Sequence, residues 1–152
     1  MSLFTINVKP FKKHFYQILI VNIAINLTTL FLIKNGIYLL SGFDPGKKFT
    51  LPFLFCMVIT AFLFTHYRKK DLKRIQSIEN FPDKVAAYES LYKERVSWYF
   101  FSNLLSCVLA ILTGRMLFYY YSIADLLFLL PFYPLRFPIK NELENQEIIF
   151  HE

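Results

Sequence analysis

The segment that decides the fold is SWYFFSNLLSCVLAILTGRMLFYYYSIADLLFLLPFYP, residues 97–134, which contains only two charged side chains, Arg115 and Asp125. Arg115 follows a glycine and divides the segment into two apolar runs, 97–114 and 116–134, which is typical of a tight helical hairpin. At 1.5 Å per residue, each run gives a helix of about 26–28 Å, close to the roughly 30 Å hydrocarbon core of a bilayer. The segment therefore predicts two membrane spans.

Two further apolar runs occur earlier in the chain, at residues 15–33 and 51–67. The 152 residues are 55% apolar and 19% aromatic, which lies outside the usual composition of a soluble domain. A soluble chain of this length has too little interior to bury four such helices on all sides. We therefore expect an all-α fold, an integral membrane four-helix bundle formed by a single domain over residues 1–152.

The basic residues predict how the chain is threaded through the membrane. With four spans, the N-terminus, residues 68–96 and the tail 135–152 lie on one side, and they carry thirteen Lys and Arg against four on the other. Cytoplasmic segments of membrane proteins carry the excess of Lys and Arg. The sequence thus predicts a multi-pass protein of the inner membrane with both termini in the cytoplasm.

The connection between the second and third spans carries apolar residues at helical spacing. Leu72, Ile75 and Ile78 form one stripe, Pro82 marks a helix stop and restart, and a second stripe continues to Val96. We expect a cytoplasmic helical hairpin over residues 68–96. Its stripes either pack on each other or dock another protein or the lipid surface.

Prolines and acidic residues characterise the end of the chain. Pro131, Pro134 and Pro138 predict a broken, extended exit from the fourth span. The tail that follows is short and acidic, and we expect it to be solvated.

Asp125 is the acidic residue within the predicted spans, nine residues from each end of the fourth. An ionisable group in hydrocarbon is expensive and raises a functional question. The spacing of polar residues on the other spans places them at a similar depth. We expect an intramembrane polar layer formed by Asp125, Asn22, Asn26, Asn103, Ser106 and Thr60.

The polar layer has more than one interpretation. Its members either form hydrogen-bonded links between helices or line a proton or cation path in which Asp125 titrates. Pairing of Asp125 with another subunit is a further possibility.

Small residues repeat at every fourth position of the third span. Such a ridge lets two helix backbones approach closely. It packs against the fourth or first span, or it mediates self-association. The predicted helix-packing residues are Ser102, Ser106, Ala110 and Gly114.

Signatures of enzymes and of metal or cofactor sites are absent from the sequence. It has no nucleophile-elbow, zinc-protease, nucleotide-loop or dinucleotide motif. The three histidines, His14, His66 and His151, are scattered, so we expect no metal and no cofactor. The basic residues lie at span ends rather than on one soluble face, so we expect no nucleic-acid partner.

Part of the chain, from residue 72 to 147, resembles small uncharacterised four-span bacterial inner-membrane proteins in its layout. The resemblance implies topology and carries no activity. It is carried by Lys84, Tyr88, Tyr92 and Arg95 before the third span, by LTG at 112–114, by PFYPLR at 131–136 and by IKNEL at 139–143.

Together these features predict a non-catalytic membrane protein, an accessory or interaction subunit that binds another membrane protein or itself within the lipid bilayer. The alternative is a small proton- or cation-coupled carrier or channel that uses Asp125. A membrane enzyme acting on lipid is a third class, which a lipid-shaped cavity beside residues 68–70 would favour.

Overall fold

The computed structural model describes residues 4–39, 48–145 and 147–151, most of which are helical. The expectation of an all-α protein is confirmed, with the addition of two short strands. The elements in chain order are β1 (Thr5–Asn7), α1 (Lys9–Lys34), α2 (Thr50–Gln76), α3 (Phe81–Thr113), α4 (Met116–Leu129), the 3-10 turn η1 (Leu130–Phe132), α5 (Arg136–Leu143) and β2 (Ile149–His151).

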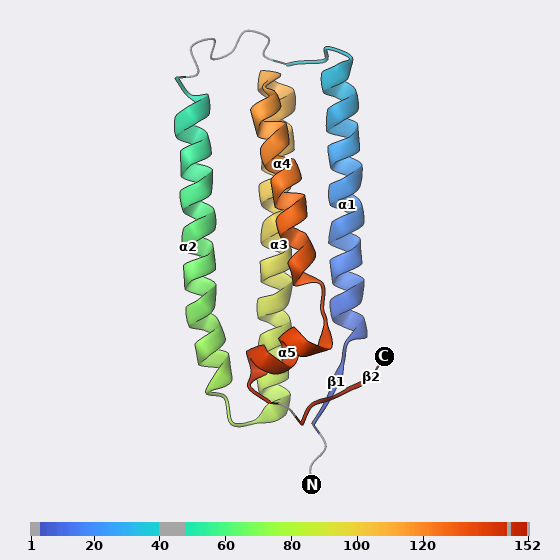
Figure 1. Ribbon diagram of the computed structural model, residues 1–152, viewed down its shortest axis with the longest axis vertical. Coiled ribbons are helices and arrows are strands. Elements are labelled where there is room, and N and C mark those ends of the chain that lie inside the picture. Colours follow the sequence, from blue (N-terminus) through green and yellow to red (C-terminus); the bar gives the residue numbers. More distant parts are fainter. Residues whose placement is uncertain (1–3, 40–47, 146, 152) are drawn as a thin grey trace.

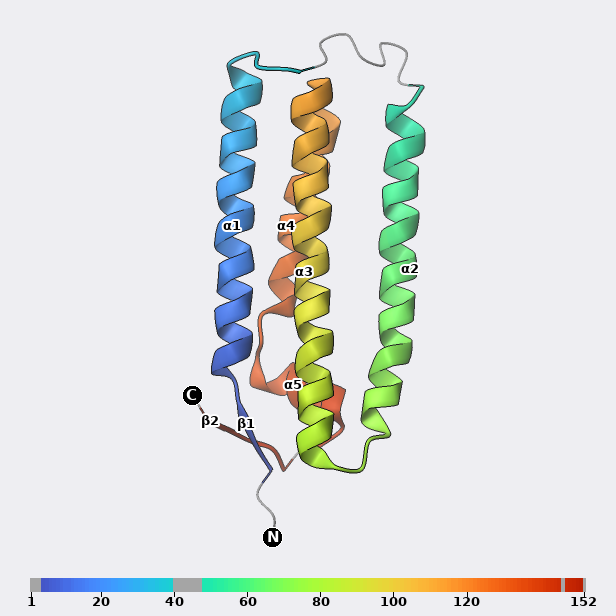
Figure 2. The same ribbon diagram turned by 180° about the vertical axis from the view of Figure 1, so that it is seen from behind.

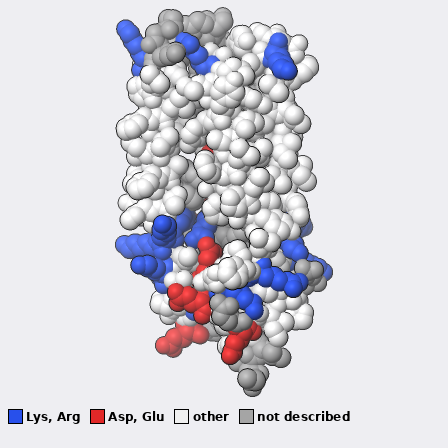
Figure 3. Space-filling model, in the orientation of Figure 1, with Lys and Arg blue, Asp and Glu red and all other residues white. Residues whose placement is uncertain are grey.

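Helices α1 to α4 run along the long axis, and α3 and α4 lie between α1 and α2 (Figures 1 and 2). Helix α3 is the central element, because it packs against α1, α2 and α4. The two strands, α5 and the turn between α2 and α3 all lie at one end of the bundle (Figure 1). We call this the charged end, because most of the acidic and basic side chains in view gather there, below a broad band that is almost free of charged side chains (Figure 3).

Three helices, α1, α2 and α3, are long and apolar enough to cross a membrane. Helix α4 with η1 forms a bent pair with α5, at an angle of 77°, and a fourth crossing results if this pair counts as one span. Helix α4 ends at Leu129, earlier than the predicted span boundary at 134. Pro131 falls in η1 and has no N–H to continue the helical hydrogen bonds.

The break between α2 and α3 lies where the sequence predicts it. Helix α2 ends at Gln76 and α3 begins at Phe81. Asn80 is the N-cap residue of α3 and has an extended conformation. Its backbone carbonyl accepts a hydrogen bond from the Lys84 N–H at 3.0 Å. Pro82 occupies the first turn, where its missing N–H costs nothing.

Gly114 ends α3 in the left-handed conformation, with φ of 65°. A Cβ atom at this position would lie 2.9 Å from the Tyr38 ring. Two constraints therefore require glycine here: the backbone angle and the close approach of the segment that follows α1.

The expectation of a solvated tail is wrong. Strand β2 pairs in parallel with β1, Ile149 opposite Thr5. Ile139, Leu143 and Ile148 are each at most 2% exposed and belong to the core at the charged end. The tail is acidic on average, but its apolar side chains are buried in the core at the charged end.

The tail also covers the apolar stripe of residues 68–96. Ile75, Tyr88, Leu91 and Val96 are buried in the same core as the tail residues and the start of α1. The stripe therefore packs inside the protein, against the tail and the N-terminal segment as well as against itself.

Candidate functional site: an amide triangle and a groove beside α2

Three buried side chains from three helices are joined by hydrogen bonds at the middle of the bundle. The Asn26 amide of α1 donates to Asn103 Oδ1 of α3 at 3.1 Å. The Ser122 hydroxyl of α4 donates to Asn26 Oδ1 at 2.7 Å, and the Asn103 amide donates to the Ser122 carbonyl at 2.7 Å. We call this set the amide triangle. It links α1, α3 and α4 through polar groups that are buried between these helices.

Ser122 is a member of the triangle that the sequence reasoning missed. It lies three residues before Asp125, on the same face of α4. That spacing is the signal that could have identified it, because Asp125 was already placed toward the bundle.

Asp125 lies beside the triangle rather than within it. Its Oδ2 accepts a hydrogen bond of 2.6 Å from the Ser102 hydroxyl, and the residue is 7% exposed. Ser102 was predicted only as a helix-packing residue, and its hydroxyl is also the partner of the acid. A short hydrogen bond to a carboxyl oxygen offsets part of the cost of burying it.

The remaining members of the predicted polar layer have different surroundings. Ser106 is buried, but its hydroxyl donates to the Ser102 carbonyl of its own helix. Thr60 is exposed on α2 and its hydroxyl donates to the Cys56 carbonyl, so the prediction that Thr60 belongs to the polar layer is wrong. Asn22 is fully buried, and its side-chain oxygen and nitrogen have no hydrogen-bond partner among the described residues.

The predicted ridge of small residues lies inside the chain. Ser106 and Ala110 have no exposed surface, and the helix that carries them packs against α4 and α1. Since these two residues are inaccessible, the ridge serves packing within one chain.

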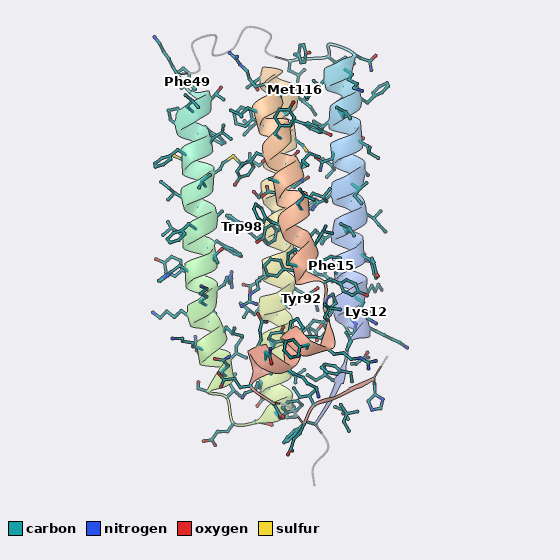
Figure 4. The ribbon with its side chains drawn as sticks, in the orientation of Figure 1. Lys12, Phe15, Phe49, Tyr92, Trp98 and Met116 are labelled. Carbon is teal, nitrogen blue, oxygen red and sulfur yellow. The ribbon has the colours of Figure 1, made fainter. Side chains whose placement is uncertain are left out.

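Helix α2 is the least covered of the three long helices. Only 11% of its most apolar segment is buried, compared with 22% for α1 and 28% for α3. One of its ring contacts with α3 is Phe64 stacked on Trp98, with ring centres 4.4 Å apart. Figure 4 shows Trp98 in the space between α2 and the centre of the bundle. Hollows flank this contact.

On the side of α4, two adjoining pockets form one groove, which we call the α2 groove. The apolar pocket has a volume of about 200 Å³ and is lined by Val58, Ala61, Phe128 and Asp125. The second pocket, about 260 Å³, is nearer the charged end. The two pockets are neighbours, because Thr65 and Tyr99 line both. The second pocket also includes Arg68, Lys69, Arg95 and Glu142.

An ion-pair network forms one wall of the second pocket. Arg95 donates two hydrogen bonds to Glu142, and Tyr88 donates a third to the same carboxylate at 2.7 Å. Burial, and then the nearby carboxylate, raise the pKa of Tyr88 well above its ordinary value, so its hydroxyl remains a donor. Arg68 pairs with Glu94 and, at 3.3 Å, with Asp71.

Metal-binding groups are not brought together in the part of the chain that the structure describes, where no three His, Cys, Asp or Glu side chains lie close enough to share an ion. Cys107 is buried, with its sulfur 3.8 Å from both Asn26 Oδ1 and Asn103 Oδ1, and Cys56 is exposed.

Comparison of the chain with models of protein families, with curated proteins and with solved structures finds no match. The resemblance to small bacterial four-span proteins therefore stays a prediction.

Proposed function

We propose that this protein is a non-catalytic interaction subunit of the inner membrane, which binds a transmembrane helix of another membrane protein or of a second copy against α2. In this proposal the chain crosses the bilayer four times. Both termini and the hairpin formed by the ends of α2 and α3 lie in the cytoplasm, as the thirteen-to-four asymmetry of basic residues favours.

The low coverage of α2 is the observation that carries the proposal. Away from α4, residues of α2 and α3 line a pocket of about 300 Å³. A larger one of about 640 Å³ adjoins it and shares Phe53 and Cys56 with it. Within a bilayer, helices associate by close packing rather than by the hydrophobic effect, so an unfilled flank favours a further helix.

The engagement of the polar groups supports a role without catalysis. Asn26, Asn103 and Ser122 satisfy one another, and Asp125 is bonded to Ser102. A membrane enzyme needs a nucleophile or general base that is open to a substrate. Among the described residues, the pocket beside Arg68 and Lys69 contains one carboxylate, Glu142, and Arg95 and Tyr88 engage it. The apolar stripe of residues 68–96 is covered by the tail, so α2 and not the connector is the surface that we assign to a partner.

Cys56 provides a direct test, because it is exposed and lines both pockets on this flank. With Cys107 replaced by Ala, a short thiol crosslinker in native membranes should join Cys56 to a partner or to a second copy. The matched control is Cys56→Ser combined with Ile59→Cys, which moves the thiol to another exposed position on α2. The proposal would be contradicted if neither the Cys56 variant nor the Ile59→Cys variant formed a crosslinked product and no partner were retained in mild detergent.

A small proton- or cation-coupled carrier or channel is the second candidate, favoured by Asp125 lining a pocket. Asp125 is the only charged side chain among the described residues that line that pocket, and α2 contributes the apolar Val58 and Ala61 and the hydroxyl of Thr65. Reconstituted protein should show flux that Asp125→Asn abolishes. Unchanged, non-zero flux in the variant would eliminate this candidate.

A further inference from the structure

The α2 groove changes from apolar to charged along its length. Its apolar part lies between Val58 and Ala61 of α2 and Phe128 of α4, and Asp125 is the one charged side chain that lines it within the described part of the chain. Its charged part, near the charged end, contains Arg68 and Lys69. A ligand that fills both parts must therefore be an amphiphile.

The charged part favours an anion. Three basic side chains and one carboxylate line it. Arg95 is engaged by two hydrogen bonds to the carboxylate of Glu142, and Arg68 is shared between Glu94 and Asp71. Lys69 forms no ion pair within the described ranges of the chain, so its ammonium is available to a ligand.

Further basic residues of α2 lie near Lys69, and aromatic rings beside the groove are typical of a membrane surface. Lys70, Lys73 and Arg74 follow on the same end of α2. The Tyr99 ring lines both parts of the groove, and the Trp98 ring lines the apolar part. Such rings are enriched at the level of lipid head groups. Basic pockets between transmembrane helices are typical sites for anionic head groups.

We propose that the α2 groove binds one phospholipid with an anionic head group. Its phosphate contacts Lys69, and one acyl chain lies along Val58, Ala61 and Phe128. The two pockets together fall within the roughly 300–1,000 Å³ typical of ligand sites. Asp125 is held by Ser102 at the far end of the groove. This site is on the α4 side of α2, so it does not depend on the partner that we assign to the other flank.

Two neighbouring lysines make a matched test. Both Lys69 and Lys70 are exposed near the same end of α2, but only Lys69 lines the groove. Protein in mild detergent is titrated with phosphatidylglycerol or phosphatidylcholine, and bound lipid is counted by native mass spectrometry. We expect one retained phosphatidylglycerol per chain, about fivefold weaker binding in Lys69→Gln, from the loss of one interfacial charge, and no change in Lys70→Gln.

A second variant tests the apolar part without altering charge. Ala61→Phe fills the groove and should also weaken binding, whereas Ile59→Phe, on an exposed face of α2 outside the groove, should not. Thermal unfolding of each variant verifies that it is folded. Inorganic phosphate at the same concentration should not displace the lipid, because it cannot fill the apolar part.

Several outcomes would overturn the proposal. Equal weakening by Lys69→Gln and Lys70→Gln would show general attraction to the surface, and equal retention of the two lipids would show that the anionic head group is not recognised. Displacement by inorganic phosphate would assign the charged pocket to a soluble anion. A copurifying protein chain that excludes lipid from the groove would assign it to a partner helix instead.

Discussion

Arg95 of α3 and Glu142 of α5 are joined by two hydrogen bonds, 2.8 and 3.1 Å long, across 47 residues of sequence. The Gln76 amide at the end of α2 donates to the Glu142 carbonyl at 2.9 Å. One residue of the tail therefore connects the end of α2 with the first half of α3, and it does so beside the charged part of the α2 groove.

Replacement of Arg95 by Met should destabilise the protein by about 2 kcal/mol, the scale of a hydrogen-bonded charged group that loses its partner. The matched control is Glu147→Gln, which removes an exposed acid of the same tail and should change stability by less than about 0.5 kcal/mol. Unfolding in mixed micelles measures both. Equal effects would show that the tail is held by its apolar residues alone.

Tyr88 should make the stability depend on alkaline pH. Its pKa is raised in the folded protein, whereas the unfolded chain ionises near the ordinary value of about 10. Its contribution is therefore fully present below pH 10, and it declines as the pH rises above 10, because only the unfolded state releases the proton. In Tyr88→Phe this decline should be shallower than in Tyr67→Phe, which alters an exposed tyrosine. If stability fell with pH in the same way in both variants, Tyr88 would not be the source of the alkaline pH dependence.

Loss of the amide triangle should weaken the link between α1, α3 and α4. Asn26→Leu removes the hydrogen bonds that Asn26 makes with Asn103 Oδ1 and with the Ser122 hydroxyl, and it leaves only the Asn103 amide bond to the Ser122 carbonyl within the triangle. Interhelical hydrogen bonds in membranes contribute about 0.6–1.7 kcal/mol each, so we expect a loss of about 1–3 kcal/mol. Thr60→Val, whose hydroxyl bonds only within α2, is the control and should be nearly neutral. A neutral Asn26→Leu would show that the triangle does not stabilise the bundle.

Substitutions at two glycines should distinguish the cost of backbone strain from the cost of a steric clash. Gly36 and Gly114 both have positive φ, but a Cβ atom has open space at Gly36 and meets the Tyr38 ring at Gly114. Gly36→Ala should cost about 1–2 kcal/mol for the left-handed conformation alone, and Gly114→Ala should cost more. Adding Tyr38→Ala should remove the excess. Equal costs at the two glycines would mean that the ring moves away freely.

The sequence allowed position along the bundle axis to be predicted better than orientation around a helix axis. The helix break near Pro82 and the juxtaposition of Asn26 with Asn103 follow from spacing along the chain. Thr60 was misplaced because α2 is apolar on nearly every side, so hydrophobic periodicity does not indicate which face is directed inward. In lipid the outer face of a helix is as apolar as the inner one. Polar residues are therefore the main indication of which face is directed toward the bundle.

The packed tail could not be predicted from its overall composition. Glu142, Glu144 and Glu147 give it an acidic average, while Ile139, Leu143 and Ile148 supply the buried face. Its partner surface comes from the first strand and from α3, more than 40 residues away in sequence. Such long-range complementarity is not contained in a local pattern.

The topology is tested most directly by cysteine labelling in spheroplasts, with both native cysteines replaced. Asn35→Cys lies after α1, Ser77→Cys lies between α2 and α3, and Glu147→Cys lies in the tail. We predict that a membrane-impermeant maleimide labels Asn35→Cys in sealed spheroplasts and labels the other two only after lysis. Labelling of all three positions before lysis, or recovery of the chain without detergent in the soluble fraction, would contradict a four-span protein with both ends in the cytoplasm.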